Sequence, residues 1–460
     1  MTPTAPPIPT RSLKHRFVGT AGWALGGHFG AQAVRFASNL VLTRLLAPEM
    51  FGVMSMIYVV FTGIGMLCDV GLGALASQSP RGNEPKFLNT LWLVQVGRGA
   101  IVTVMALGAA ALLALVVARG GLPSQSVYAD PRLPWLIVAL SVIGVTDGLQ
   151  STRILAARRN LSIARLTKMD LACQFATTAF ILAWAEFDPS VRALAAGWLF
   201  GSALHTVLSH TMLPGPPNRV EWDRAAFDEI RRFGTWVVVS SPLSFLLGSG
   251  DRILLGAYLD APTMGLYSIA LLLIAALQGA VQGVIGAAVL PALSEVVRDK
   301  PAALRQTLYR IRRPLAIACL VPAGALTVLG SSVVRWLYDP RYAGAGWMLS
   351  AVAMTLAVSY LSVFDQCLIA LRRVKRLSLL NALRLATLCA FVPLGHAVFG
   401  ARGAVTGVAA TALVNAVLTL AVQNRMGLLD LRGELAALPL FGAGIAAGAL
   451  VQVVAGAFAR

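Results

Sequence analysis

Charged residues are scarce in this sequence. Only 13% of its 460 residues are Asp, Glu, Lys or Arg, whereas 57% are hydrophobic. Soluble globular domains carry about 25% charged residues, so the composition excludes a chain of ordinary soluble domains and indicates a membrane protein. The polar segments between the apolar runs are short. We therefore expect no folded domain outside the membrane.

Cysteine, histidine and nucleotide-binding motifs are also poorly represented. The five cysteines all lie inside long apolar runs, which excludes a disulfide framework and a thiolate zinc cluster. The five histidines are scattered without metal-ligand spacing, and no Gly-x-x-x-x-Gly-Lys-Ser/Thr phosphate loop occurs. We accordingly expect no cofactor, no metal and no enzymatic activity.

What the sequence does contain is a series of long hydrophobic segments. A bilayer core about 30 Å thick requires about 20 apolar residues in a helix, which satisfies its own backbone hydrogen bonds. Thirteen segments qualify, and they predict an all-α polytopic membrane protein. These segments cover residues 18–43, 51–77, 88–117, 133–156, 163–185, 191–213, 231–258, 263–290, 309–336, 344–370, 377–400, 403–426 and 435–457.

The basic residues indicate the orientation of these spans. Lys and Arg number 38 against 20 Asp and Glu, and most of them fall on the side of the N-terminal arm, including the basic stretches at 153–168 and 372–376. By the positive-inside rule this side faces the cytosol, so we predict a multi-pass membrane protein with a cytosolic N-terminus. The net charge of +18 is then a topology signal, and nucleic acid is not an expected partner.

An internal repeat divides the chain. At an offset of 210 to 214 residues, Phe51-Gly52 aligns with Met264-Gly265, and Arg158-Arg159 aligns with Arg372-Arg373. Both halves begin on the cytosolic side, which predicts two parallel six-helix bundles with a substrate site between them near the midplane. The predicted parts are a disordered cytosolic arm (1–17), a first bundle (18–213), an amphipathic cytosolic linker (214–232), a second bundle (233–426) and an extra C-terminal transmembrane segment (427–460).

The linker carries an apolar face and a basic face. One interpretation places the apolar face in lipid and the basic residues at the headgroups; the other is a surface helix that joins the two bundles. The apolar residues of this face are Trp222, Ala226, Phe227, Ile230 and Phe233.

Several turns resemble a known family. The stretches Thr43–Gly52, Gly250–Gly256, Leu290–Ser294 and Leu337–Tyr342 are similar to the polysaccharide-transporter branch of the multidrug/oligosaccharidyl-lipid/polysaccharide (MOP) exporter superfamily. The resemblance implies twelve or fourteen spans in two bundles around a central cavity. It also implies a Wzx-type flippase of the bacterial inner membrane, which moves undecaprenyl-pyrophosphate-linked oligosaccharide units from the cytosolic to the periplasmic leaflet for O-antigen or exopolysaccharide assembly.

The same resemblance implies partners. They are a polyprenyl-pyrophosphate-linked glycan and membrane lipids, with the polysaccharide polymerase and chain-length machinery as further candidates. Two other functions stay open on the residues alone. A multidrug cation antiporter of the same superfamily would use the intramembrane aspartates, and a membrane polymerase or ligase would require larger outer loops than this chain has.

Ionised side chains inside the spans are the first functional candidates, because each costs about 2.5 to 3.5 kcal/mol at the centre of a lone helix. In the first span, His28, Gln32, Arg35 and Asn39 lie on one helical face. We expect Arg35 to bind the diphosphate of the lipid carrier, since a guanidinium matches phosphate oxygens. The alternative is that the stripe only packs against polar neighbours.

Two further candidates combine a base with an acid. Asp69 and Arg98 fall at similar depth on adjacent spans, which predicts a structural ion pair or a gate. Arg252 follows Asp251 near the outer end of the seventh span, where the choices are a local ion pair, cavity lining or an outer gate.

The remaining candidates are uncharged amides and lone acids. Asp147 and Asp365 occupy related places in the two halves, and a carboxylate there is a candidate for proton or cation coupling. Gln278 and Gln282 lie one helical turn apart, and either bind sugar hydroxyls or phosphate, or hydrogen-bond between helices. Asp170 is the last intramembrane charge.

Overall fold

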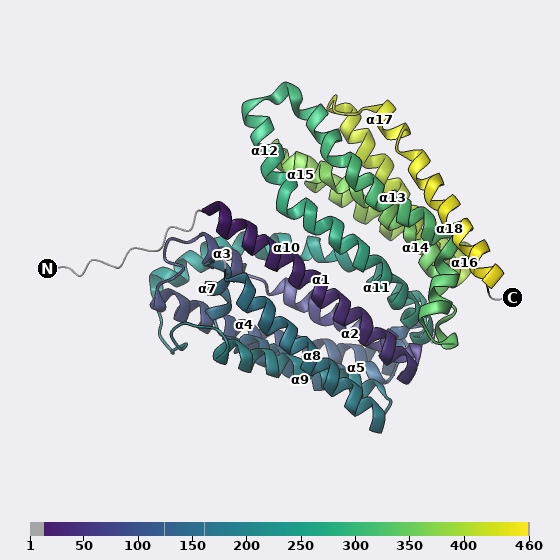
Figure 1. Ribbon diagram of the computed structural model, residues 1–460. Coiled ribbons are helices and arrows are strands. Elements are labelled where there is room, and N and C mark those ends of the chain that lie inside the picture. The colour runs from purple at the N-terminus through teal and green to yellow at the C-terminus, as the bar shows by residue number, and fades with distance from the viewer. Residues whose placement is uncertain (1–12, 124, 161, 459–460) are drawn as a thin grey trace.

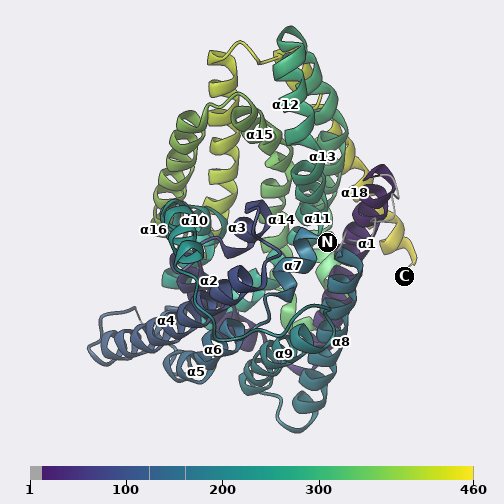
Figure 2. The same ribbon diagram turned by 90° about the vertical axis from the view of Figure 1, so that its left-hand side faces the viewer.

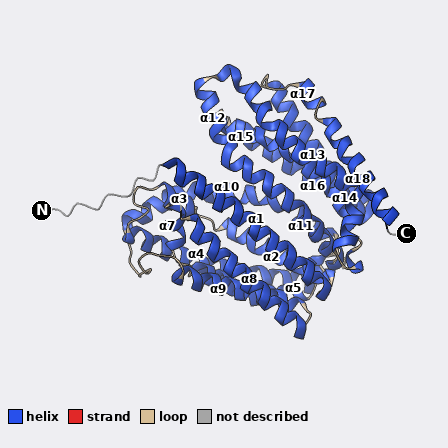
Figure 3. Ribbon diagram, viewed as in Figure 1, coloured by secondary structure: helices blue, strands red, loops and turns tan. Residues whose placement is uncertain are grey.

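The computed structural model describes residues 13–123, 125–160 and 162–458, and this part of the chain is helical, without strands (Figure 3). The first half contains α1 (Leu13–Leu45), α2 (Pro48–Leu67), α3 (Leu72–Gln78), α4 (Pro85–Ala118), the 3₁₀ turn η1 (Val127–Ala129), α5 (Arg132–Leu140), α6 (Val142–Gly148), α7 (Arg153–Arg159), α8 (Ile163–Phe187) and α9 (Val191–Thr211). The second half contains α10 (Arg224–Tyr258), α11 (Ala261–Val284), α12 (Leu290–Asp299), α13 (Leu304–Leu337), α14 (Ala345–Val358), the 3₁₀ turn η5 (Ser359–Ser362), α15 (Val363–Ala370), α16 (Val374–Arg425), α17 (Leu431–Leu435) and α18 (Leu438–Phe458).

Every predicted segment overlaps a helix. Eight helices of the described residues are long and apolar enough to cross a membrane, and two bent pairs raise this number to ten. The count of thirteen spans therefore stays a prediction. Residues 1–12 of the predicted arm lie outside the described residues, and residues 13–17 form the start of α1.

The long helix α16 is a hairpin. Its backbone leaves the helical conformation at Phe399 and at Gly400, which has a φ of 60° that glycine adopts readily. The two arms then pack backbone to backbone, since a Cβ on Gly395 would lie 2.1 Å from the carbonyl oxygen of Gly403. The two predicted segments 377–400 and 403–426 are thus the two arms of α16.

The two halves meet where α2 and α11 cross and spread apart towards the ends that carry α7 and α15 (Figure 1). Figure 2 looks from this spread end. At the crossing, a Cβ on Gly52 would lie 1.9 Å from the carbonyl oxygen of Ala261, and a Cβ on Gly265 would lie 1.8 Å from that of Pro48. The contact is reciprocal, as expected for two parallel repeats, and it joins the halves at the predicted periplasmic end.

The outer loops repeat this reciprocity. Tyr128, in the loop after α4, donates a hydrogen bond to the carbonyl oxygen of Ile253 in α10 at 3.1 Å. Tyr342, in the loop after α13, donates one to the carbonyl oxygen of Leu46 at the end of α1 at 2.8 Å. Each half therefore holds the first helix of the other half.

Part of the linker's apolar face packs against protein, whereas Trp222 of the same face is 54% exposed. Ala226 and Ile230 are 0% and 2% exposed, and they pack against α3 and α4 around Leu72 and Phe87. The helical conformation is interrupted between α2 and α3 at Gly71, whose φ is 67°. This break turns the apolar side of α3 towards the linker, so protein covers Ala226 and Ile230.

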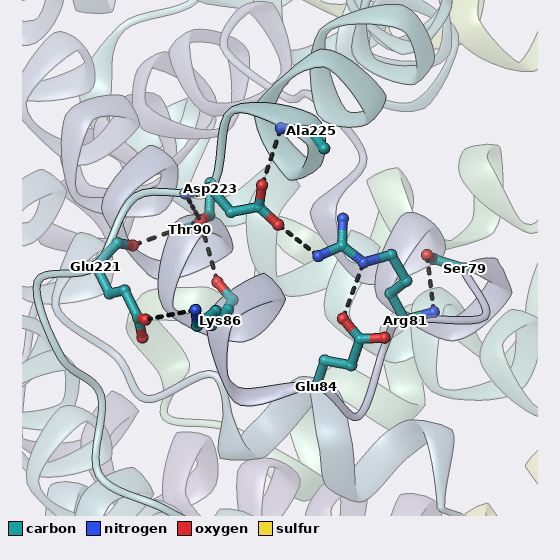
Figure 4. A network of polar contacts seen from close by, with 8 residues as sticks. All are labelled: Ser79, Arg81, Glu84, Lys86, Thr90, Glu221, Asp223 and Ala225. Carbon is teal, nitrogen blue, oxygen red and sulfur yellow. Dashed lines mark hydrogen bonds and ion pairs between the residues drawn. The ribbon is translucent and has the colours of Figure 1, made fainter.

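A polar network fixes the same segment from outside (Figure 4). Asp223 caps α10 by accepting a hydrogen bond from the Ala225 N–H at 2.9 Å, and it forms an ion pair with Arg81. Arg81 also binds Glu84 at 2.9 Å, and Asp223 N–H donates to Thr90 Oγ1 at 2.9 Å. The linker is thus bound to the first half before α10 enters the second.

A buried ion pair anchors the C-terminal segment. Arg312 of α13 is 2% exposed, and its Nη1 lies 2.6 Å from Glu434 of α17. Tyr309 donates a hydrogen bond to Glu434 at 2.7 Å, and Gln423 accepts one from Arg312 at 3.1 Å. Further along, α18 packs closely on α13, since a Cβ on Gly324 would lie 2.2 Å from the carbonyl oxygen of Phe441.

Candidate functional site: two polar pockets

Most of the predicted site residues line one of two pockets, one in each half. The larger pocket, about 820 Å³, lies among α10, α11 and α14 to α16, and is called the C-half pocket here. The smaller, about 360 Å³, lies among α2, α4, α6 and α9, and is called the N-half pocket. The predicted residues in the C-half pocket are Asp251, Arg252, Gln278, Gln282 and Asp365. Those in the N-half pocket are Arg98 and Asp147.

Arg252 and Asp251 do not pair with each other. Asp251 instead accepts a hydrogen bond from the Tyr267 hydroxyl at 2.6 Å, because α11 presents this buried tyrosine to α10. Arg252 lines the pocket, and its guanidinium forms no ion pair with any of the described residues. Of the sequence alternatives, the local ion pair is wrong and cavity lining is observed.

Asp365 has a partner that the sequence reasoning missed. Arg384, on the first arm of α16, binds both carboxylate oxygens, at 2.9 Å and 3.1 Å. The guanidinium also donates to Asn381 at 3.1 Å and to Thr419 at 2.9 Å. A signal existed, since Arg384 lies inside the predicted span 377–400 and shares a helical face with Asn381. In this structure Asp365 is neutralised from within the protein.

The two glutamines form bonds between helices and also border the pocket. Gln278 donates to Thr355 at 3.2 Å and to Ser359 at 3.1 Å, and Gln282 donates to Ser362 at 3.2 Å. Their amide nitrogens thus hold α11 against the 3₁₀ turn η5. The interhelical interpretation is observed.

The predicted pair of Asp69 and Arg98 is absent from the described residues. Asp69 follows the end of α2 and accepts a hydrogen bond from the Gly71 N–H at 3.0 Å. Arg98 donates from Nη2 to the carbonyl oxygen of Gly65 at 3.0 Å. The prediction was wrong because α2 stops at Leu67, so Asp69 lies in a turn and caps its own chain.

Asp147 lies beside a helix interruption. It accepts hydrogen bonds from Ser202 at 2.7 Å and from Gln150 at 3.0 Å, next to the end of α6 at Gly148. Asp365 likewise follows the short 3₁₀ turn η5. Helices interrupted at corresponding places of two repeats are a feature of substrate and ion sites in transporters.

Three residues of the stripe in the first span line neither pocket, namely Gln32, Arg35 and Asn39. Gln32 and Asn39 are half-buried, and Arg35 is exposed, with no ion pair among the described residues. The side chain of His28 lies outside the described residues. The last intramembrane aspartate, Asp170, contacts His205 at 3.3 Å.

Comparison with known proteins points to one group. The sequence model of a family described as polysaccharide biosynthesis protein matches residues 41–345. The lipopolysaccharide biosynthesis protein WzxC of Escherichia coli (strain K12) is 22% identical over 343 residues, which cover 73% of this chain and 65% of that protein. The match therefore spans slightly less than two thirds of this relative.

Solved structures share the architecture. The lipid II flippase MurJ, in an inward closed conformation, superposes with a TM-score of 0.69 at 10% identity, covering 95% of this chain and 93% of MurJ. An inward-facing multidrug resistance transporter of the MATE family, in the MOP superfamily, gives a TM-score of 0.67 at 14% identity, covering 86% and 94%. The predicted all-helical MOP-type fold is confirmed.

Proposed function

Because this chain belongs to the polysaccharide biosynthesis protein family, we propose that it is a flippase for undecaprenyl-pyrophosphate-linked oligosaccharide units. It moves them from the cytosolic to the periplasmic leaflet of the bacterial inner membrane, with its N-terminus in the cytosol. The observation that carries the proposal is Arg252, a cation without an ion-pair partner among the described residues, in a pocket of about 820 Å³.

The chemistry of the C-half pocket suits the head of such a substrate. A guanidinium offers planar, paired donors for phosphate oxygens, and a charge-assisted bond of this kind is stronger than a neutral one. Asp365 is already neutralised by Arg384, and Asp251 is occupied by Tyr267. Arg252 is therefore the group in this pocket that remains available to a diphosphate. The polyprenyl chain stays in the bilayer, because transferring this apolar chain from lipid to water would be costly.

The position of the closed end supports a movement by alternating access. The reciprocal contacts of Gly52 and Gly265 close the predicted periplasmic end, whereas the halves spread towards the predicted cytosolic end. Alternating access then requires this crossing to open while the opposite ends approach. Arg35, exposed on α1, is the second diphosphate contact in this proposal.

A leaflet assay tests the function. In a strain that lacks this protein, lipid-linked units are expected to accumulate on the cytosolic leaflet, and wild-type protein should restore surface polysaccharide. Arg252→Ala should abolish this restoration at normal membrane abundance, and Arg252→Lys should restore part of it, because a lysine keeps the charge without the planar donors. Arg313→Ala is the matched control, since Arg313 is exposed and borders neither pocket.

Two results would contradict the proposal. Full polysaccharide export with Arg252→Ala would remove Arg252 from the site. Accumulation of the units on the periplasmic leaflet in the deletion strain would show a step after flipping, such as polymerisation or ligation.

A further inference from the structure

The N-half pocket combines an aromatic wall with a polar wall. The aromatic wall is Trp198 of α9, held by Phe61 at a centroid distance of 5.5 Å and 73° and by Tyr58 at 6.1 Å and 37°. Trp198 and Phe61 both line the pocket. A large aromatic ring at the side of a cavity offers a flat apolar surface with polarised edges.

The polar wall holds both donors and acceptors. Three polar side chains line the pocket and contrast with the apolar rings, namely Arg98, Asp147 and Gln150. The Nε of Arg98 is buried and has no hydrogen-bond partner among the described residues. A buried donor without an acceptor is costly, so Arg98 keeps unused hydrogen-bonding capacity beside the pocket.

Neighbouring bonds hold these groups in place. Gln95 donates to the carbonyl oxygens of Gly148 at 3.1 Å and Gln150 at 2.9 Å, across the interruption between α6 and α7. Ser202 fixes the Asp147 carboxylate at 2.7 Å. The polar wall is thus preorganised, which lowers the cost of binding.

Charge and size define the class of ligand. Arg98 and Asp147 place a basic and an acidic group in the same pocket, so the site favours a neutral polar ligand over a cation or a second phosphate. The volume of about 360 Å³ lies at the lower end of the range for small-molecule sites, about 300 to 1,000 Å³. A hexose suits this pocket. It is neutral, it has an apolar C–H face for the aromatic wall, and it carries hydroxyls around its rim for the polar wall.

We propose that the N-half pocket binds one sugar ring of the lipid-linked unit, with Trp198 against its C–H face and Arg98, Asp147 and Gln150 on its hydroxyls. This inference rests on the proposed function and adds the part of the substrate that the N half recognises. The diphosphate belongs to Arg252 in the C half, and the sugar belongs to Trp198 in the N half.

The test separates sugar binding from diphosphate binding. The full-length protein in nanodiscs is titrated with undecaprenyl diphosphate, and with the same carrier bearing glucose, galactose or N-acetylglucosamine. The wild-type protein is expected to bind at least one sugar-bearing carrier about tenfold more tightly than the sugar-free carrier, which corresponds to about 1.4 kcal/mol. Trp198→Ala should remove this difference and leave the Kd of the sugar-free carrier unchanged.

Variants and controls make each outcome decisive. Trp198→Phe should keep part of the preference, and Gln150→Ala should reduce it, whereas Trp184→Ala, near the end of α8 and outside the pocket, should not change it. Equal affinity for all four carriers, or an unchanged preference in Trp198→Ala, would overturn the sugar site while leaving diphosphate binding intact. Failure to bind any of the four carriers would instead overturn the proposed function.

Discussion

Replacing Glu434 with Ala is expected to destabilise the C-terminal part of the protein strongly. The carboxylate lies 2.6 Å from Arg312 Nη1, and the side chains are 10% and 2% exposed. Two other nitrogens of the guanidinium, Nε and Nη2, have no partner among the described residues. Without Glu434, the buried cation keeps only Gln423 and the rings of Tyr309 and Tyr360, at 5.6 Å and 5.0 Å, around it.

The magnitude follows from this loss of compensation. Removing one partner of a buried ion pair costs about 3 to 5 kcal/mol, because the other charge stays buried and unpaired. Removing both charges with groups of similar volume is often close to neutral. The double variant Arg312→Met with Glu434→Gln should therefore recover most of the stability that Glu434→Ala loses.

Unfolding in detergent micelles, followed as a function of temperature or of added SDS, measures these differences. Arg313→Met is the matched control, because this exposed neighbour carries the same charge on the same helix. A loss below about 1 kcal/mol for Glu434→Ala would place the pair among exposed salt bridges in energetic terms and refute the reasoning. The reasoning would also be refuted if the double variant Arg312→Met with Glu434→Gln were less stable than Glu434→Ala alone.

Two further predictions concern the crossing of α2 with α11 and the linker between the two halves. Gly52→Ala places a Cβ 1.9 Å from the Ala261 carbonyl oxygen, so it should lower the free energy of unfolding by about 1 to 3 kcal/mol and make a cysteine introduced by Ala261→Cys more reactive to an impermeant maleimide. The control Gly108→Ala, with open space around the added Cβ, should change neither quantity. Equal maleimide reactivity in the two backgrounds would contradict the closed crossing. At the linker, the Arg81 hydrogen bond lowers the pKa of Asp223, so this contact stabilises the protein above the unfolded pKa of about 3.9 and is lost as the pH falls through the lower folded value. The difference in Tm between wild type and Arg81→Gln should be constant from about pH 8 to pH 4 and shrink below that; a difference that grows on acidification would contradict the assignment.

The sequence was most informative where periodicity and repetition determine the structure. Thirteen apolar segments predicted the helices, and the internal repeat aligned Gly52 with Gly265, two residues that the structure brings together at the crossing. Both features are local or internal to the chain, so they can be recognised without coordinates. For Arg252 the sequence left a local ion pair, cavity lining and an outer gate open, and the structure places this residue in the C-half pocket.

Pairings between distant helices were the part that the sequence left undetermined. Arg384 neutralises Asp365, and Glu434 neutralises Arg312, across separations that no periodicity encodes. The Asp69 prediction was wrong for a related reason: depth was counted along a straight helix, whereas α2 ends at Leu67. Side-chain partners depend on where helices end and cross, and apolar periodicity predicts those boundaries only within several residues.

Symmetry and asymmetry between the halves serve different purposes in the proposed mechanism. The crossing and the outer loops are reciprocal, because closing the predicted periplasmic end requires each half to meet the other in the same way. The halves have diverged: at an offset of 214 residues, Asp170 of the first half, which borders neither pocket, corresponds to Arg384 of the second. In the second half a guanidinium neutralises the pocket aspartate Asp365, whereas in the first half Ser202 donates a hydrogen bond to Asp147. A substrate with a charged diphosphate at one end and neutral sugars at the other requires such a difference, since identical pockets would not discriminate its two ends.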